Sequence, residues 1–161
     1  MPTVSRGIPA HPHLSVPKQQ ARDLLNQCQA LMPEALERVR RQRLKFKSLS
    51  DLEVSKAVKL SDAQFVIARE YGLASWAQLK QRIVESEAAQ MIDRAIRSGD
   101  AAAVTKLLSA HPQLLEIPVV SGNWGPPMSH AANMGNLDMV RTIAALGAKD
   151  FQHAFERALL H

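Results

Sequence analysis

The sequence contains an internal repeat with an offset of 36 residues. Residues 95–108 (AIRSGDAAAVTKLL) align without gaps on residues 131–144 (AANMGNLDMVRTIA). The shared frame is a small residue, a glycine and two apolar residues, in the pairs Ala95 and Ala131, Gly99 and Gly135, Val104 and Val140, and Leu107 and Ile143. A fixed period of this kind is typical of supersecondary units that bury their apolar faces only by stacking on their neighbours. The repeat therefore predicts a row of similar helical units in the C-terminal part of the chain.

The composition also favours helices. Hydrophobic residues make up 46% of the 161 residues, which is enough for a core, whereas aromatic residues make up only 4% and the seven Gly and nine Pro are scattered. The single cysteine, Cys28, excludes an internal disulfide and a zinc site with several Cys ligands. No stretch approaches the roughly 18 apolar residues that a membrane span needs. We expect an all-α, soluble, cytoplasmic protein.

The N-terminal half is predicted to hold a flexible arm and a small helical module. The first seventeen residues contain four Pro and no continuous apolar stretch, so residues 1–16 are expected to form the arm. From there apolar residues recur at the helical period and place Cys28 on a buried face, and Pro33 suits the first position of a second helix. The module is assigned to residues 17–87. Ser-x-x-Glu/Gln spacings predict three more short helices, which start at Ser50, Ser61 and Ser75.

The excess positive charge lies in residues 1–90, which hold 14 Lys and Arg against 9 Asp and Glu, while residues 91–161 hold six of each kind. One run without acidic residues supplies six cations: Arg38, Arg40, Arg41, Arg43, Lys45 and Lys47. The favoured interpretation is a solvated helix face. The alternative is nucleic-acid binding, in which this run contacts phosphates beside a helical hairpin at residues 60–84 that resembles a helix-turn-helix. Few side chains of the hairpin's second helix suit base contacts, so a structural hairpin is favoured.

Residues 123–150 resemble an ankyrin repeat. The signature Thr-Pro-Leu-His-x-Ala-Ala-x-x-Gly, followed by a Val and a closing Gly-Ala, is matched at Pro127, Met128, Ala131, Ala132, Gly135, Val140, Gly147 and Ala148. Pro126 and Ser129 replace the Thr and the His of the signature, so the hydrogen bonds that brace neighbouring repeats must be weakened or replaced. The resemblance implies a short ankyrin-like helical solenoid over residues 88–161, with about two repeats and a partial third that begins at Phe151.

The resemblance extends upstream, because residues 60–80 (LSDAQFVIAREYGLASWAQLK) are similar to a helical module that precedes ankyrin repeats in a group of bacterial proteins. The upstream similarity implies no activity. The ankyrin resemblance implies a protein-protein interaction module, since ankyrin repeats bind partners on a concave surface of loop tips and inner helices. The positions implied to contact the partner are Asn123, Trp124, Gly125, His130, Asn133 and Met134. Trp124 is either an exposed hot spot or a plug that folds onto the neighbouring prolines.

The remaining expectations concern chemistry and assembly. The six His form no nucleophile-base pair by spacing, and the sequence has no Gly-rich phosphate loop, HExxH or paired-carboxylate motif. We therefore expect no enzyme activity, no cofactor and no metal site, with an unidentified protein as partner and no membrane contact. The partial third repeat leaves the C-terminal edge open, so we expect an improvised end, a truncated array or an edge covered by a partner, including self-association.

Overall fold

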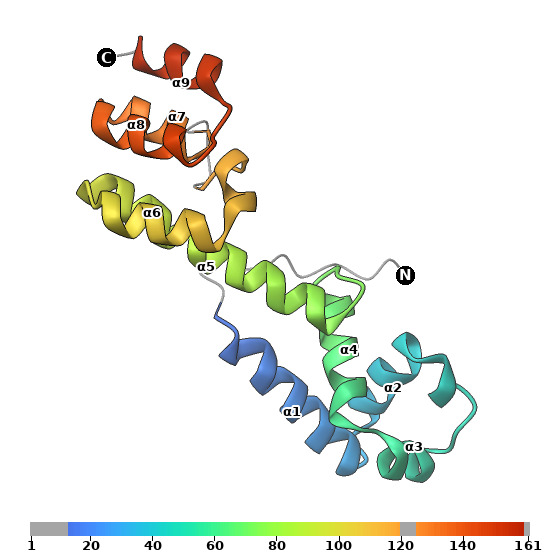
Figure 1. Cartoon of the computed structure of the whole chain (residues 1–161). Coiled ribbons are helices and arrows are strands. Elements are labelled where there is room, and N and C mark those ends of the chain that lie inside the picture. Colours follow the sequence, from blue (N-terminus) through green and yellow to red (C-terminus); the bar gives the residue numbers. More distant parts are fainter. Residues whose placement is uncertain (1–12, 120–124, 160–161) are drawn as a thin grey trace. The chain divides into compact units, whose positions relative to one another are not determined.

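A computed structural model describes residues 13–119 and 125–159, and every regular element in these residues is helical, which confirms the all-α prediction. The described residues divide into unit 1, which ends at Val84, and unit 2, which begins at Glu85. None of the described helices is long and apolar enough to cross a bilayer. The elements are α1 (Ser15–Gln29), α2 (Pro33–Gln42), η1 (Leu44–Phe46), α3 (Asp51–Ala57), α4 (Leu60–Glu70), α5 (Trp76–Ser98), α6 (Ala101–Ala110), η2 (Pro112–Glu116), α7 (Pro127–Asn133), α8 (Leu137–Ala145) and α9 (Phe151–Ala158) (Figure 1).

Unit 1 is a cluster of short helices in which α1 packs against α4, and α2 and α3 pack against each other and against α1. Its apolar core includes Leu24, Leu36 and Val66. Cys28 is fully buried, as predicted, and burial raises the pKa of its thiol, while the positive charge of Arg38 opposes that rise. The thiol is therefore protonated at neutral pH and acts as a small apolar core group.

Several predicted helix starts are confirmed. Helix α2 begins at Pro33. Helix α3 begins with a capping box, in which the N–H of Ser50 donates to Glu53 Oε2 at 2.8 Å and the N–H of Glu53 donates to Ser50 Oγ at 3.4 Å. Helix α5 begins directly after Ser75, whose Oγ accepts from the N–H of Gln78 at 3.2 Å. Local side-chain chemistry thus sets these starts.

Three details of the prediction are wrong. Helix α4 begins at Leu60 instead of after Ser61, because the carboxylate of Asp62 accepts from the N–H of Lys59 at 3.1 Å and satisfies the first turn. Helix α1 begins at Ser15, two residues before Pro17, where the helical pattern is predicted to begin. Helix α5 is not short, since it runs for 23 residues and supplies apolar side chains to the cores of both units.

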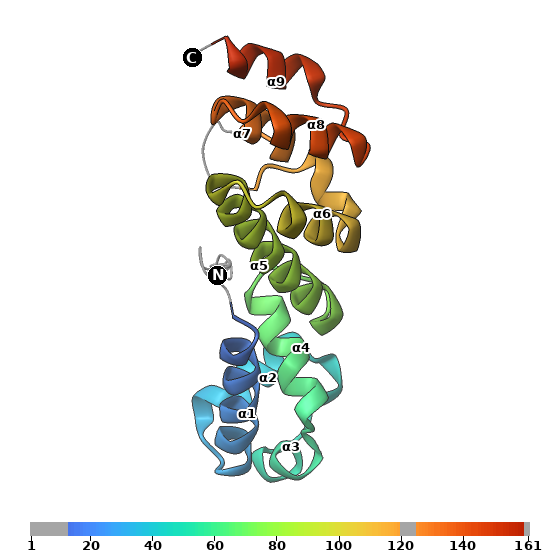
Figure 2. The ribbon, with the colours of Figure 1, turned by 60° about the vertical axis from the view of Figure 1, so that its left-hand side comes forward.

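Unit 2 is built in layers: the second half of α5 with α6, then α7 with α8, then α9 (Figures 1 and 2). The first two layers repeat the same turn 36 residues apart. Gly99 and Gly135 have left-handed backbone conformations with φ of +74° and +68°. The next residues cap α6 and α8, because Asp100 accepts from the N–H of Ala103 at 2.9 Å and Asn136 accepts from that of Met139 at 3.0 Å. The sequence repeat is therefore also a repeat of local structure.

Helix α7 is the central element of unit 2. It packs against both α8 and α9, and all of its residues from Pro127 to Ala132 are buried. Ser129 donates its N–H to Asp150 Oδ2 at 3.1 Å, and its hydroxyl donates to the same oxygen. Asp150 directly precedes α9, so Ser129, which replaces the signature His, does form a hydrogen bond between two layers.

A second polar contact joins α7 to α5. His130 Nε2 lies 2.8 Å from Asp93 Oδ1, and Nε of Arg97 donates to that same oxygen at 2.8 Å. Both Asp93 and Arg97 belong to α5. Adjacent side chains of α7 therefore bind the layer before it and the layer after it.

The packing of α9 on the start of α7 can be tested at Gly125. A Cβ on Gly125 (φ +78°) would lie 2.6 Å from Nδ1 of His153 and 2.9 Å from Cβ of Ser129, which is fixed on the buried helix. We predict that Gly125→Ala lowers the free energy of unfolding by about 2–4 kcal/mol, from backbone strain and from the displacement of His153. Chemical denaturation measures this loss.

The matched control is Gly135→Ala, because Gly135 has a similar φ and open space where its Cβ would lie. Only backbone strain acts there, and we expect the free energy of unfolding to fall by about 1–2 kcal/mol. Equal losses in the two variants would contradict the close packing of α9 on Gly125.

Candidate functional site

Most cations of the basic run at residues 38–47 are paired with carboxylates from other parts of unit 1. Arg38 of α2 forms a bidentate contact with Glu70 of α4, with both N–O distances at 2.9 Å. Arg40 of α2 donates to Asp51 of α3 at 2.6 Å. These contacts tie α2 to α4 and to α3.

Asp62 is the centre of the most buried of these contacts. Its carboxylate is 0% exposed and accepts from Nη2 and Nε of Arg43 at 2.7 and 3.0 Å and from Lys45 at 2.7 Å. The guanidinium of Arg43 also lies 4.6 Å from the centre of the Phe65 ring. Burial alone raises the pKa of the Asp62 carboxyl, but hydrogen bonds from Lys45, Arg43 and the N–H of Lys59 outweigh it and lower that pKa. Asp62 is therefore ionised at neutral pH and holds two cations as counter-ions.

These pairs weaken the case for nucleic-acid binding. A cation that neutralises a phosphate has to give up its carboxylate partner, and affinity for nucleic acid depends on several such phosphate contacts. Within the run, Arg41 forms only a long exposed contact with Glu37, at 4.0 Å, and Lys47 has no ion pair within residues 13–119 and 125–159. Nucleic-acid binding stays a prediction, and the observed contacts favour a structural role for the run.

Four of the six residues predicted to contact a protein partner are described by the structure, and these four do not form one surface. Asn123 and Trp124 lie outside the described residues, so their predicted role stays a prediction. Asn133 is half-buried and Met134 is exposed, and both lie at the C-terminal end of α7. These two residues can still contact a partner.

The predictions for Gly125 and His130 are wrong, because both residues are buried. The side chain of His130 is 0% exposed and bonds Asp93 inside unit 2, so it faces no binding groove. Gly125 lies against His153 and Ser129. Both residues position α7 and α9 instead of contacting a partner.

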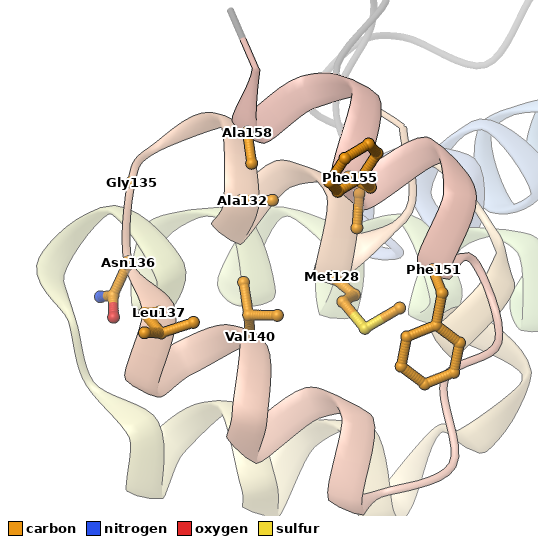
Figure 3. A pocket seen from close by; sticks show the side chains of 10 residues that line it. Met128, Ala132, Gly135, Asn136, Leu137, Val140, Phe151, Phe155 and Ala158 are labelled. Carbon is orange, nitrogen blue, oxygen red and sulfur yellow. The ribbon is translucent and has the colours of Figure 1, made fainter. Parts of the chain in front are cut away.

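An apolar groove of about 300 Å³ lies on unit 2 between α8 and α9, with α7 as its floor (Figure 3). Among the lining residues that the structure describes, the only polar side chain is Asn136, whose Oδ1 already accepts from the N–H of Met139 at the start of α8. Within residues 13–119 and 125–159, no charged residue lines it. The lining residues are Met128 and Ala132 from α7, Leu137 and Val140 from α8, Phe151, Ala154, Phe155 and Ala158 from α9, and Gly135 and Asn136 from the turn before α8.

Helix α9, which forms one wall of the groove, buries Ala154 and leaves its large apolar residues, and Leu159 directly after it, exposed. Ala154 is buried, whereas Phe151, Phe155 and Leu159 are 59%, 65% and 69% exposed. Burial of one such side chain contributes about 1.5–3 kcal/mol, so a helix normally turns these residues inward. Exposed apolar residues that gather beside a groove mark an interaction surface.

Sequence reasoning missed the exposed residues of this surface. The available signal was the spacing of the phenylalanines, because two of the four in the chain lie four residues apart in one short helix. That spacing puts both rings on one face of a helix. The face that α9 buries is set by Ala154 and by contacts with α7, which the helical period alone does not reveal.

We predict that Asp62→Asn lowers the free energy of unfolding of unit 1 by about 2–3 kcal/mol at pH 7, because Arg43 and Lys45 lose a buried counter-ion. The control Glu37→Gln removes an exposed contact with Arg41 in the same unit and should change that free energy by about 0.5 kcal/mol at most. Urea unfolding at pH 7 measures both losses.

The loss of stability in Asp62→Asn should also depend on pH. Because the pKa of Asp62 is lower in the folded than in the unfolded chain, its stabilisation is complete above the ordinary value of about 3.9 and is lost as the pH falls through the folded pKa. The stability difference between wild type and Asp62→Asn should therefore narrow in acid. A difference that stays constant down to about pH 2 would contradict the proposed ion pairs.

His130 predicts a second pH dependence, in unit 2. Burial lowers the pKa of His130 more than the hydrogen bond and charge of Asp93 raise it, and Arg97 adds to the lowering. The unfolded chain therefore takes up the proton first, so stability is full above about pH 6.5 and declines as the pH falls towards the folded pKa. Thermal unfolding between about pH 7 and 5 should show this decline in wild type and a weaker one in His130→Gln. Identical slopes in the two proteins would refute it.

Comparisons of this chain with protein-family models, with curated proteins and with solved structures found no match. The ankyrin resemblance therefore rests on the motif at residues 123–150 and on the internal repeat. Function has to be inferred from that repeat and from the surface of unit 2.

Proposed function

We propose that this chain is a non-catalytic protein-interaction module of ankyrin-repeat type that binds a protein partner along the edge formed by α8 and α9. The observation that carries the proposal is the apolar groove between these helices, beside the exposed rings of Phe151 and Phe155 (Figure 3). Such a surface loses unfavourable contact with water when an apolar partner covers it.

The repeat supports the ankyrin-type part of the proposal. In this interpretation the layers of unit 2 are successive repeats of a short solenoid, and α9 is the first helix of a third repeat. The left-handed Gly99 and Gly135 and the helix caps after them recur at the 36-residue offset. In stacked repeats each unit contacts its neighbours on both sides, and here α7 bonds Asp93 of α5 and Asp150 at the start of α9.

The chemistry of the groove favours a protein over a small polar ligand or nucleic acid. Small-molecule sites combine an apolar lining with a few polar groups that orient the ligand. Here the only polar side chain in the described part of the lining, Asn136, already caps α8. Residues 91–161 carry equal numbers of basic and acidic side chains, so this part of the chain has no excess charge to attract phosphates. An apolar protein surface is the partner that fits.

We predict that Phe155→Glu abolishes partner binding through this edge, because a charge replaces an exposed ring beside the groove. Affinity capture from a lysate of the source cells, with wild type and Phe155→Glu as baits, measures the loss of the captured protein.

The matched control is Met91→Glu, which puts the same charge on an exposed apolar position of α5 that does not line the groove. It should capture the partner as wild type does, and both variants should unfold at nearly the wild-type temperature because both positions are exposed. Recovery of the same proteins in the same amounts with Phe155→Glu would contradict the proposed surface.

A further inference from the structure

The helices that pack between the layers of unit 2 share one spacing of their buried apolar residues. Helix α6 buries Val104 and Leu108, and α8, which packs on both α6 and α7, buries Met139 and Ile143. In each helix the two buried apolar residues are four positions apart. A helix with this spacing lays both side chains along one line of contact.

Helix α9 has apolar residues at the same four-residue spacing, but on its exposed face. Phe151, Phe155 and Leu159 follow one another at intervals of four residues, all three are well over half exposed, and no described element covers them. The unfilled groove lies beside this ridge, and Phe151 and Phe155 themselves form part of its wall (Figure 3). The same edge of the molecule therefore carries both a groove and a ridge of the kind that fills grooves in this unit.

We propose that the occupant of the groove is α9 of a second copy of this chain, so that two copies pair about a two-fold axis that passes beside α9. This inference rests on the proposed function of the α8–α9 edge as a protein-binding surface, and it names the partner. In a two-fold arrangement the ridge of each copy enters the groove of the other, and the contact closes after two subunits. A single interface between the two copies then covers both the groove and the ridge of each copy.

The charges of this part of the chain suit self-association. A large net charge keeps proteins apart, whereas residues 91–161 carry six basic and six acidic side chains. The last turns of α9 carry one acidic and one basic residue, Glu156 and Arg157. Two copies can therefore approach along α9 without an excess of like charges. A strongly acidic or strongly basic partner surface would not find a better match in charge here than a second copy does.

The mass of the full chain in solution tests this proposal. By sedimentation equilibrium over about 1–200 µM, wild type should shift from monomer to dimer, as expected for a small apolar interface. Phe155→Glu should raise the dimer dissociation constant by at least about tenfold, whereas Met91→Glu should leave it unchanged. The thermal unfolding of all three proteins is compared to confirm that each is folded.

Cross-linking locates the contact. With a short bifunctional thiol reagent, Leu159→Cys should give a covalent dimer whose yield falls when Phe155→Glu is added, and Met91→Cys should not give one. The natural Cys28 is buried and is the same in both variants.

A chain that stays monomeric at the highest concentration, or a dimer that Phe155→Glu leaves intact, overturns the second copy as the occupant. If such a monomeric chain still captures another protein in a Phe155-dependent way, the occupant is a segment of that protein and the proposed function stands. If neither dimer nor Phe155-dependent capture is found, both proposals fail.

Discussion

Unit 2 depends on a buried helix that carries two polar side chains next to each other. Ser129 and His130 of α7 are removed from water, so each has to find a hydrogen-bond partner inside the protein. Ser129 finds Asp150 at the start of α9, and His130 finds Asp93 on α5. The burial of apolar side chains has no preferred direction, whereas a hydrogen bond requires its donor and acceptor at a set distance and angle. These two bonds fix α7 and thereby place the α8–α9 groove.

In unit 1 a buried ionised group also needs partners inside the protein. A fully buried carboxylate, Asp62, requires cations, and Arg43 and Lys45 supply them from the segment between α2 and α3. The positive charges that suggest a phosphate-binding surface in the sequence are in part counter-ions of an internal acid. The charge of a segment therefore indicates little about its partners until the partners inside the fold are known.

The sequence predicts the features that depend on neighbouring residues. Pro33 and the Ser50 capping box lie where local rules put them, and the two glycines of the repeat frame, Gly99 and Gly135, share one backbone conformation. It does not predict pairs between distant residues, such as Arg38 with Glu70 or Asp93 with His130, which are 32 and 37 positions apart. A histidine in a repeat helix suggests a surface position until Asp93 is known to lie beside it. The groove was missed for the same reason, since its walls come from three helices.

The affinity that the exposed ridge of α9 can provide depends on how the rest of unit 2 holds α9. A peptide of eight residues forms little helix in water, because helix nucleation is costly and short helices are marginal. Here α7 holds this helix through Asp150 and through the buried Ala154, so the rings of Phe151 and Phe155 keep helical spacing before any partner arrives. Binding then requires little further ordering of α9, and more of the free energy of burying the two rings appears as affinity. The buried polar bonds of α7 therefore determine how well the apolar edge can bind.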